Sequence, residues 1–327
     1  MTMSQETLDL VVRGLRQEST NVVSLELSLP DGGPLPHWEP GAHLEVILPS
    51  GLVRHYSLCS EPRQLQKYRL AVLRENGGRG GSEELHSQIR IGTKLTARGP
   101  RNHFRVEDGA AHHLLVAGGI GITPIMAMAR ELKAAGKSTR LVYCGSSRQT
   151  MAFIDELQEI MGDSLALYPR DELGRADLLT EIQNAPEGTA VYACGPERLL
   201  TDLQGITAAT LGSDAFHAEL FKAATPTTRT VTEDETKTDA PFEVELRQSG
   251  CTLTVPPEKS VLDVVLGVNP SFMSSCEEGF CGTCETKVLE GEVDHRDTIL
   301  SEKERAKNDT MFICVSRSKC PKLVLDA

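Results

Sequence analysis

The sequence lacks the features of an exported or membrane protein. No apolar run reaches the roughly 18 residues that a transmembrane helix requires. Residues 1–6 have neither the basic start nor the apolar core of a signal peptide. We therefore expect a cytoplasmic protein that binds no membrane, in which cysteines outside a metal site are free thiols rather than disulfides. Five cysteines scattered along the chain fit this expectation: Cys59, Cys144, Cys194, Cys251 and Cys320.

Basic charge is also scarce. The 327 residues include 34 Lys and Arg against 46 Asp and Glu, which gives a formal net charge of -12. This balance argues against nucleic-acid binding and favours a basic or electrostatically complementary protein partner, although acidity that only maintains solubility explains it equally well. The sequence has no internal repeat. Its length exceeds what one hydrophobic core normally serves, so we expect two or three domains.

The remaining four cysteines form a motif near the C-terminal end. Three of them are spaced C-x4-C-x2-C, and 29 residues separate the third from a solitary fourth. This spacing is typical of the ligands of a plant-type [2Fe-2S] cluster; zinc is the main alternative, but zinc sites usually use two close pairs. Gly279 and Gly282 favour the cluster, because glycine lets backbone N–H groups approach inorganic sulfide closely. The predicted ligands are Cys276, Cys281, Cys284 and Cys314.

The rest of the chain divides by its hydrophobic pattern. Alternating apolar residues predict strands at 8–12, 23–27, 43–48 and 68–73, which indicates an antiparallel barrel or sandwich. Beyond residue 112, apolar strands at 113–117, 139–144 and 190–194 alternate with helical patterns at 124–135 and 153–161, which indicates an α/β parallel sheet. A polar stretch reads as a solvated tether before the cysteine-rich part. The predicted domains are 1–108, 109–223, the tether 224–240, and 241–327.

Two glycine turns predict a nucleotide crevice in the α/β part. Gly118–Pro124 follows a strand and opens a helix, with Thr123 placed to cap the helix and Pro124 suited to its first position. Such a turn offers N–H groups to a pyrophosphate, although a tight strand-to-helix connection is the plain alternative. The second turn, Cys194–Glu197, ends a later strand at the edge where ligands of open α/β sheets bind.

In the barrel part, a strand carries residues suited to a flavin. Arg54 and Tyr56 share one face of the strand and Ser57 lies on the other, so phosphate, ring system and polar ring atom each have a matching group. A half-exposed strand face is the plain alternative. The glycine-rich loop at 78–82 is a second phosphate-type loop with an arginine and a hydroxyl.

These signals, in this order and over nearly the whole chain, resemble the phthalate dioxygenase reductase-type family, part of the ferredoxin-NADP reductase superfamily. The resemblance rests on R-x-Y-S at 54–57, G-R-G-G-S at 78–82, G-G-I-G-I-T-P at 118–124, C-G-P-E at 194–197, the four cysteines and the tail 323–326. It implies an FMN-binding antiparallel β-barrel, an NAD-binding α/β domain and a C-terminal β-grasp ferredoxin domain.

The resemblance also implies a role for each matching residue. Arg54 holds the FMN phosphate, Tyr56 packs on the isoalloxazine ring, and Ser57 hydrogen-bonds near flavin N5. The nucleotide turns present the nicotinamide to the flavin, with Cys194 beside it in a positioning role, since no activating base is near. The other predicted cofactor contacts are Arg79, Gly80, Gly81 and Ser82 for FMN, Gly119, Gly121, Thr123, Gly195 and Pro196 for the nucleotide, and Phe221, whose alternative role is packing in the domain interface.

By resemblance, the protein is the monomeric reductase component of a two-component Rieske oxygenase system. It takes hydride from NADH to FMN and passes single electrons through the cluster, since a two-electron donor and a one-electron acceptor need a carrier between them. The alternatives are a reductase for a diiron monooxygenase or a cytochrome, and a cluster-based redox sensor. The residues leave NADH and NADPH open, because Arg148 could meet a 2'-phosphate and Asp171 could bind ribose hydroxyls; the family favours NADH.

Overall fold

The computed structural model describes residues 7–75, 80–221, 240–270, 272, 274, 277, 279, 282–300 and 302–327. Contacts divide the chain into two compact units, residues 1–221 and 222–327. Three predicted site residues, Arg79, Cys276 and Cys281, lie outside the described residues, and so does the expected tether apart from Ala240. The finer boundaries at residues 108 and 223 stay predictions. Within the described residues, no helix is long and apolar enough to cross a membrane.

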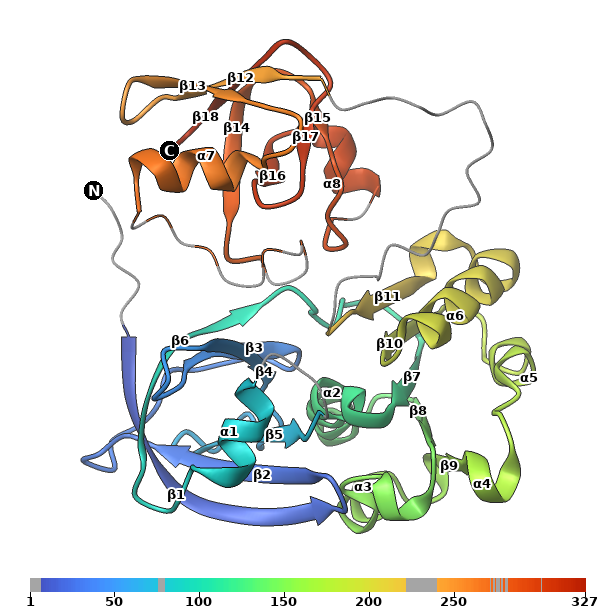
Figure 1. The fold of residues 1–327 in the computed structure, drawn as a ribbon. Coiled ribbons are helices and arrows are strands. Elements are labelled where there is room, and N and C mark those ends of the chain that lie inside the picture. Colours follow the sequence, from blue (N-terminus) through green and yellow to red (C-terminus); the bar gives the residue numbers. More distant parts are fainter. Residues whose placement is uncertain are drawn as a thin grey trace. The chain divides into compact units, whose positions relative to one another are not determined.

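Six antiparallel strands form the first sheet, in the order β4-β3-β6-β1-β2-β5 (Figure 1). Their apolar side chains, among them Leu25, Leu44 and Leu70, share one core. The N–H of Cys59, just after β4, donates to the carbonyl of Arg69 in β5 at 2.9 Å, so the two edge strands are linked. This open barrel confirms the expected antiparallel architecture. Its elements are β1 (Thr7–Ser19), β2 (Val22–Ser28), β3 (Ala42–Ile47), β4 (Val53–Ser57), β5 (Tyr68–Leu73), α1 (Gly81–Ser87) and β6 (Lys94–Asn102).

The second sheet has five parallel strands in the order β11-β10-β7-β8-β9, as the α/β pattern predicts. Its central strands are buried on both faces: α2 and α3 pack on one face, and α5 and α6 on the other. The elements are β7 (His112–Gly118), α2 (Ile122–Ala134), β8 (Thr139–Gly145), α3 (Ile154–Met161), β9 (Leu165–Pro169), α4 (Arg170–Leu173), α5 (Leu178–Gln183), β10 (Thr189–Cys194), α6 (Glu197–Thr210) and β11 (Phe216–Glu219), with 3-10 turns η1 (Gly119–Gly121), η2 (Arg148–Thr150), η3 (Gly162–Ser164) and η4 (Ser213–Ala215).

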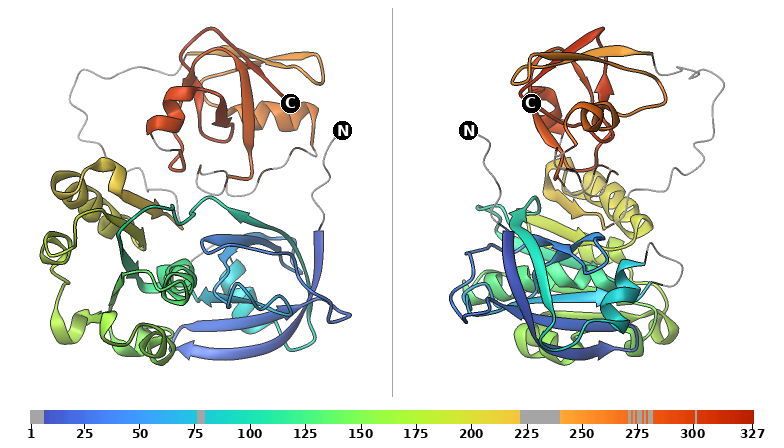
Figure 2. Two further views of the ribbon diagram at one scale, coloured as in Figure 1. Left: turned by 180° about the vertical axis from the view of Figure 1, so that it is seen from behind. Right: turned by 60° about the vertical axis from the view of Figure 1, so that its left-hand side comes forward.

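The barrel and the parallel sheet belong to the same compact unit and lie side by side (Figure 2). Cys59, Ala71 and Phe104 from the barrel side join the core that α2 and α3 form with the parallel sheet. The two sheets are therefore joined by shared apolar packing.

The second unit is built on a mixed sheet of order β13-β12-β18-β14-β16. Among the described strands of this sheet, only the β12–β18 pair is parallel. The apolar face of α7 packs on the sheet through Val261, Leu262 and Val265. This confirms the expected ferredoxin domain. Its elements are β12 (Phe242–Leu246), β13 (Cys251–Val255), α7 (Val261–Val268), β14 (Glu285–Glu290), β15 (Val293–Asp294), α8 (Glu302–Lys307), β16 (Thr310–Phe312), β17 (Arg317–Ser318) and β18 (Lys322–Leu325).

Candidate functional site

The two glycine turns of the parallel sheet lie against each other. A Cβ atom on Gly121 would stand 2.2 Å from the carbonyl oxygen of Cys194, and one on Gly195 would stand 2.9 Å from the Cα atom of Gly118. No side chain larger than glycine fits such an approach without displacing backbone. Because β7 and β10 pair in parallel, both turns emerge at the carboxyl edge of the sheet, where the sequence predicted a crevice.

The start of α2 differs from the prediction. We expected Thr123 to cap the helix and Pro124 to occupy its first position, but α2 begins at Ile122, and the Thr123 hydroxyl donates to the carbonyl of Ile120 at 3.0 Å. The 3-10 turn η1 leads directly into α2, so the helix begins one residue before Thr123. No side chain caps the N-terminal end of α2, and its dipole is free to act on an anion.

Cys194 is buried next to a carboxyl group that the sequence did not point out. Burial raises the pKa of the Cys194 thiol well above its ordinary value, and Glu219, its register partner on β11, adds to the rise. Burial also raises the pKa of Glu219 to about 8, and its Oε2 atom has no hydrogen-bond partner. A thiol held neutral is a poor nucleophile, which agrees with the expected positioning role of Cys194.

Phe221 lies just past β11. It is partly buried and packs against the core shared by the barrel and the parallel sheet. The packing alternative therefore describes a contact that is present, while contact with a cofactor stays a prediction.

The barrel places Arg54, one of the predicted flavin contacts, against the predicted phosphate loop at Gly81. Arg54 and Tyr56 lie opposite Val46 and Leu44 of β3, and Ser57 faces the other side, opposite His43. Arg54 lies directly on the glycine loop, since a Cβ atom on Gly81 would stand 2.6 Å from its Nε atom. Burial raises the pKa of Tyr56 above its ordinary value, so its hydroxyl stays protonated.

The loop beside Arg54 fits a phosphate group. Gly80 has a positive φ of 83° and precedes α1, whose N-terminal end has no side-chain cap. The Ser82 hydroxyl accepts a hydrogen bond from the N–H of Glu75 at 3.2 Å. The Arg54 guanidinium of β4 thus lies against a segment that carries a hydroxyl and backbone N–H groups, which is the donor set that a phosphate monoester needs.

Two of the four predicted cluster ligands lie in the core of the second unit. Cys284 immediately precedes β14 and Cys314 follows β16; both are buried in one apolar cluster. The N–H of Ile313 and the carbonyl of Cys284 lie 3.5 Å apart, so the two cysteine-bearing segments run side by side. Among the described residues no group of three potential metal ligands occurs, and the four-cysteine site stays a prediction because Cys276 and Cys281 lie outside them.

The loop around the predicted cluster requires glycine, as expected. Gly279 and Gly282 have φ values of 74° and 77°, a region that favours glycine. A Cβ atom on Gly279 would stand 2.6 Å from Cγ2 of Val315. The Gly279 carbonyl accepts from the N–H of Thr298 at 3.0 Å, next to the buried Asp297. The sequence did not predict this hydrogen bond from Thr298 to the loop.

The residues that bear on NADH against NADPH lie after β8 and β9. The Nε atom of Arg148 donates to Glu172 at 3.0 Å, and both side chains are about half exposed. The N–H of Asp171 donates to the carbonyl of Ser146 at 3.2 Å, which joins the two loops. Arg148 is therefore already paired with a carboxylate.

Comparisons with known proteins cover the whole chain. Residues 244–319 match the 2Fe-2S iron-sulfur cluster binding domain, and residues 93–216 match the dimethylamine monooxygenase subunit DmmA-like, N-terminal domain. A phthalate dioxygenase reductase of Burkholderia cepacia is 36% identical over 100% of both chains, and a vanillate O-demethylase oxidoreductase of a Pseudomonas species is 38% identical over 98% of this chain and 99% of its own.

Solved structures agree with these relatives. A phthalate dioxygenase reductase structure has a TM-score of 0.70 and 35% identity over 98% of both chains. An intact type IV self-sufficient cytochrome P450 monooxygenase has a TM-score of 0.90 and 40% identity over 98% of this chain, which spans 41% of the longer protein.

Proposed function

The chain belongs to the phthalate dioxygenase reductase-like family, and we propose that it passes electrons from NADH through FMN and a [2Fe-2S] cluster to a Rieske-type terminal oxygenase. It is an NAD(P)H-dependent flavin and iron-sulfur oxidoreductase, the reductase component of an oxygenase system. The observation that carries the finer proposal is the joining, within one compact unit, of a phosphate-type loop at Arg54 with the two packed turns at Gly121 and Cys194.

NADH rather than NADPH is supported by the pairing of Arg148. A 2'-phosphate would have to displace Glu172 from the Arg148 guanidinium, and the displaced carboxylate would repel it. A ribose hydroxyl meets no such obstacle. The same loops leave carboxylates, Glu172 and Asp171, near the place where ribose hydroxyls would bind.

FMN is supported by the phosphate-type loop beside β4. Arg54 on Gly81, with Ser82 and Arg79 in the same loop, offers donors for one terminal phosphate. Arg54→Ala is expected to release the flavin, whereas Arg16→Ala, an exposed arginine of the same barrel, keeps it. Stoichiometric FMN in the purified Arg54→Ala variant would overturn this assignment.

The chemistry needs a group that takes two electrons at once and gives them up singly, which a bound flavin supplies. The protein positions the reactants. The turns at Gly121 and Gly195 would hold the pyrophosphate of the nucleotide, Tyr56 would pack on the flavin ring, and Ser57 would donate a hydrogen bond to it. Cys194 stays a neutral thiol beside the nicotinamide, because burial opposes its ionisation.

A Rieske partner is supported by the relatives' names and by redox poise. Plant-type clusters have reduction potentials of about -400 mV, and those of Rieske centres begin at about -150 mV. The difference of roughly 250 mV favours electron transfer to the Rieske centre by about four decades in equilibrium constant. An acidic ferredoxin domain, with 15 Asp and Glu against 10 Lys and Arg from residue 241 onward, suits a complementary protein surface. A cytoplasmic location is part of the same proposal.

A cytochrome P450 partner is the second candidate, because the chain is 40% identical to part of a self-sufficient P450. The test is to extract and identify the flavin, reduce the holoprotein with NADH without oxygen, and follow cluster reoxidation by a purified Rieske oxygenase and by a purified P450. We expect FMN, rapid bleaching by NADH, a cluster signal in electron spin resonance and faster reoxidation by the Rieske protein. FAD, or faster reoxidation by the P450, would contradict the proposal.

A further inference from the structure

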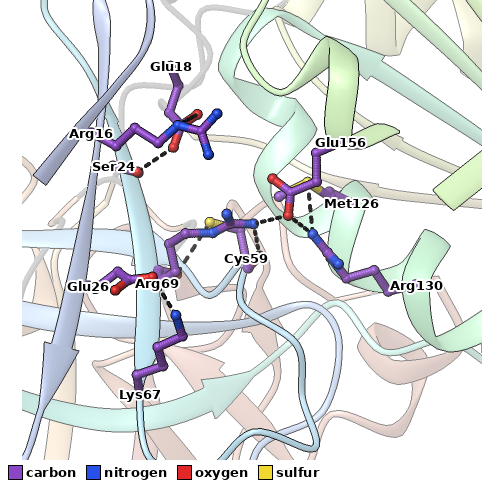
Figure 3. A network of polar contacts seen from close by, with 10 residues as sticks. All are labelled: Arg16, Glu18, Ser24, Glu26, Cys59, Lys67, Arg69, Met126, Arg130 and Glu156. Carbon is purple, nitrogen blue, oxygen red and sulfur yellow. Dashed lines mark hydrogen bonds and ion pairs between the residues drawn. The ribbon is translucent and has the colours of Figure 1, made fainter. Parts of the chain in front are cut away.

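A single carboxylate joins the barrel to the parallel-sheet side of the first unit. Oε1 of Glu156, in the first turn of α3, accepts a hydrogen bond from Nη2 of Arg69 in β5 at 2.7 Å and another from Nη2 of Arg130 in α2 (Figure 3). The three side chains are mostly buried, with exposed fractions of 26%, 14% and 20%. Two cations from different layers thus share one anion.

Arg69 makes further contacts on both the barrel side and the α3 side. Its Nη2 atom donates to the carbonyl of Cys59 at 3.1 Å, and its guanidinium lies 5.1 Å from the centre of the Phe153 ring. Phe153 is buried and has a φ of 64°, a conformation that is uncommon for a bulky residue. The start of α3 is therefore fitted closely to Arg69.

Arg130 links this contact to the nucleotide turn. It lies eight residues after Ile122, the first residue of α2, and a helix rises about 1.5 Å per residue, so the two are about 12 Å apart on one rigid rod. The helix follows directly from the turn that contains Gly121. A shift of Arg130 relative to Arg69 therefore moves the nucleotide turn relative to the barrel.

We propose that Glu156 is a positioning residue for hydride transfer, because it holds α2 against β5 and so fixes the nicotinamide at reaction distance from the flavin. The inference rests on the proposed function. Without the carboxylate, two mostly buried guanidinium groups face each other with no shared counterion, and they repel. Hydride transfer needs its reacting atoms about 3–3.5 Å apart, and a misplacement of about 1 Å can cost about 100-fold in rate.

Other contacts hold the barrel against the parallel-sheet side when Glu156 is replaced. The N–H and the hydroxyl of Thr20, in the β1–β2 turn, both donate to the carbonyl of Gln149, at 3.0 and 2.9 Å. The apolar core that contains Cys59 and Ala71 also remains. A Glu156→Gln variant is therefore expected to fold with a displaced α2.

The test compares Glu156→Gln with Asp155→Asn, an exposed residue in the same helical turn. In rapid-mixing experiments on the FMN-loaded chain, we expect Glu156→Gln to slow flavin reduction roughly 10- to 100-fold while the Kd for NADH changes less than about twofold, since the nucleotide turn itself is intact. Asp155→Asn should match the wild type. Adding Arg130→Met to Glu156→Gln removes the repulsion and should restore part of the rate. An unchanged rate in Glu156→Gln, or a loss explained by Kd alone, would overturn the proposal.

A measurement on the flavin-free protein separates this inference from the proposed function. Hydrogen exchange of the α2 and β5 amides should be faster in Glu156→Gln than in the wild type and unchanged in Asp155→Asn. Unchanged exchange in Glu156→Gln would contradict the proposal that Glu156 holds α2 against β5. A wild-type protein whose flavin is not reduced by NADH would instead refute the proposed function, whatever the exchange result.

Discussion

Gly121 lies on the backbone of Cys194, so closely that a methyl group at position 121 would stand 2.2 Å from the Cys194 carbonyl oxygen and 2.8 Å from the N–H nitrogen of Gly195. The contact is between two backbones, which cannot move aside as a flexible side chain can. The loop that precedes α2 and the loop that follows β10 therefore pack as one rigid unit.

Gly121→Ala should push these two turns apart. We expect kcat/KM for NADH to fall by at least about tenfold, because the N–H groups of the two turns no longer converge on one site, and a loss of that size corresponds to about 1.4 kcal/mol. Steady-state kinetics of the FMN-loaded variant would measure it. Gly205→Ala, in α6 with nothing within 4 Å of the added methyl group, is the control and should behave as the wild type. A wild-type kcat/KM in Gly121→Ala would show that the turns do not bind the nucleotide.

Glu172→Gln should weaken the discrimination against NADPH. It frees Arg148 to pair with a 2'-phosphate, and exposed ion pairs of this kind change affinities by roughly two- to fivefold. The ratio of kcat/KM for NADPH to that for NADH should rise by that factor, with the value for NADH nearly constant. Glu187→Gln, which changes an exposed residue just before β10, should leave the ratio unchanged. A ratio that stays constant in Glu172→Gln would remove Arg148 from the specificity argument.

Gly81→Ala should weaken flavin binding without damaging the fold. The added methyl group would lie 2.6 Å from Nε of Arg54, a side chain that can swing away, so the guanidinium leaves the loop while the barrel stays intact. We expect the Kd for FMN to rise by roughly tenfold, since a charge-assisted contact contributes about 1.5–3 kcal/mol. Fluorescence titration of the flavin-free protein measures this, with Ser87→Ala at the exposed end of α1 as the control. Unaltered affinity would mean that Arg54 does not contact the phosphate.

Cys314→Ser should abolish the cluster but leave flavin reduction intact. Cys314 is buried in the same apolar cluster as Cys284 in the second unit, whereas the predicted FMN and nucleotide contacts belong to the first unit. Iron analysis and electron spin resonance should show no [2Fe-2S] signal, while NADH still bleaches the flavin. Cys320→Ser, which removes a partly exposed cysteine of the same unit that is no predicted ligand, should retain both iron and signal. A full cluster signal in Cys314→Ser would exclude Cys314 as a ligand.

Glu219 should make the first unit less stable as pH rises. Its pKa is about 8 in the folded protein against an ordinary value of 4.5, so between these values the folded state binds more protons than the unfolded state. Raising the pH through this window removes that proton and lowers the free energy of unfolding, by an amount on the order of a few kcal/mol. Trp38, the only tryptophan, is buried in the barrel and reports unfolding of this unit by fluorescence.

Glu219→Gln should flatten this dependence in the flavin-free protein between pH 5 and about 8. Glu187→Gln, an exposed carboxyl, should retain the wild-type slope. A slope in Glu219→Gln as steep as in the wild type would show that another group causes it.

Local pattern predicted most of the fold. The alternation at 68–73 matches β5 residue for residue, and the expected strand 43–48 differs from β3 by one residue at each end. These strands have one apolar face and turn residues at both ends, so their limits are encoded locally. The predicted start of α2 was wrong because the Thr123 hydroxyl donates to the carbonyl of Ile120 instead of capping the helix. The pattern of residue types does not distinguish such a bond from a cap.

The less predictable features depend on contacts between distant segments. Glu219 is partly buried beside Cys194 because β11 pairs with β10, and Glu156 is shared because β5, α2 and α3 meet. In the sequence both are ordinary glutamates among apolar neighbours, with no spacing that marks them. A buried carboxyl is recognised only when the topology is known, whereas the cysteine and glycine motifs carry their chemistry in their spacing.

The burial of Cys194 also bears on chemical durability. Flavins and iron-sulfur clusters that meet oxygen generate peroxide, which oxidises cysteine through the thiolate form. Cys194 and Cys59 have no exposed surface, and burial raises the pKa of Cys59 to about 11. Both sulfurs therefore stay protonated and out of reach of the oxidant, and for Cys194 the packing that aligns the two turns is also what shields the sulfur from damage.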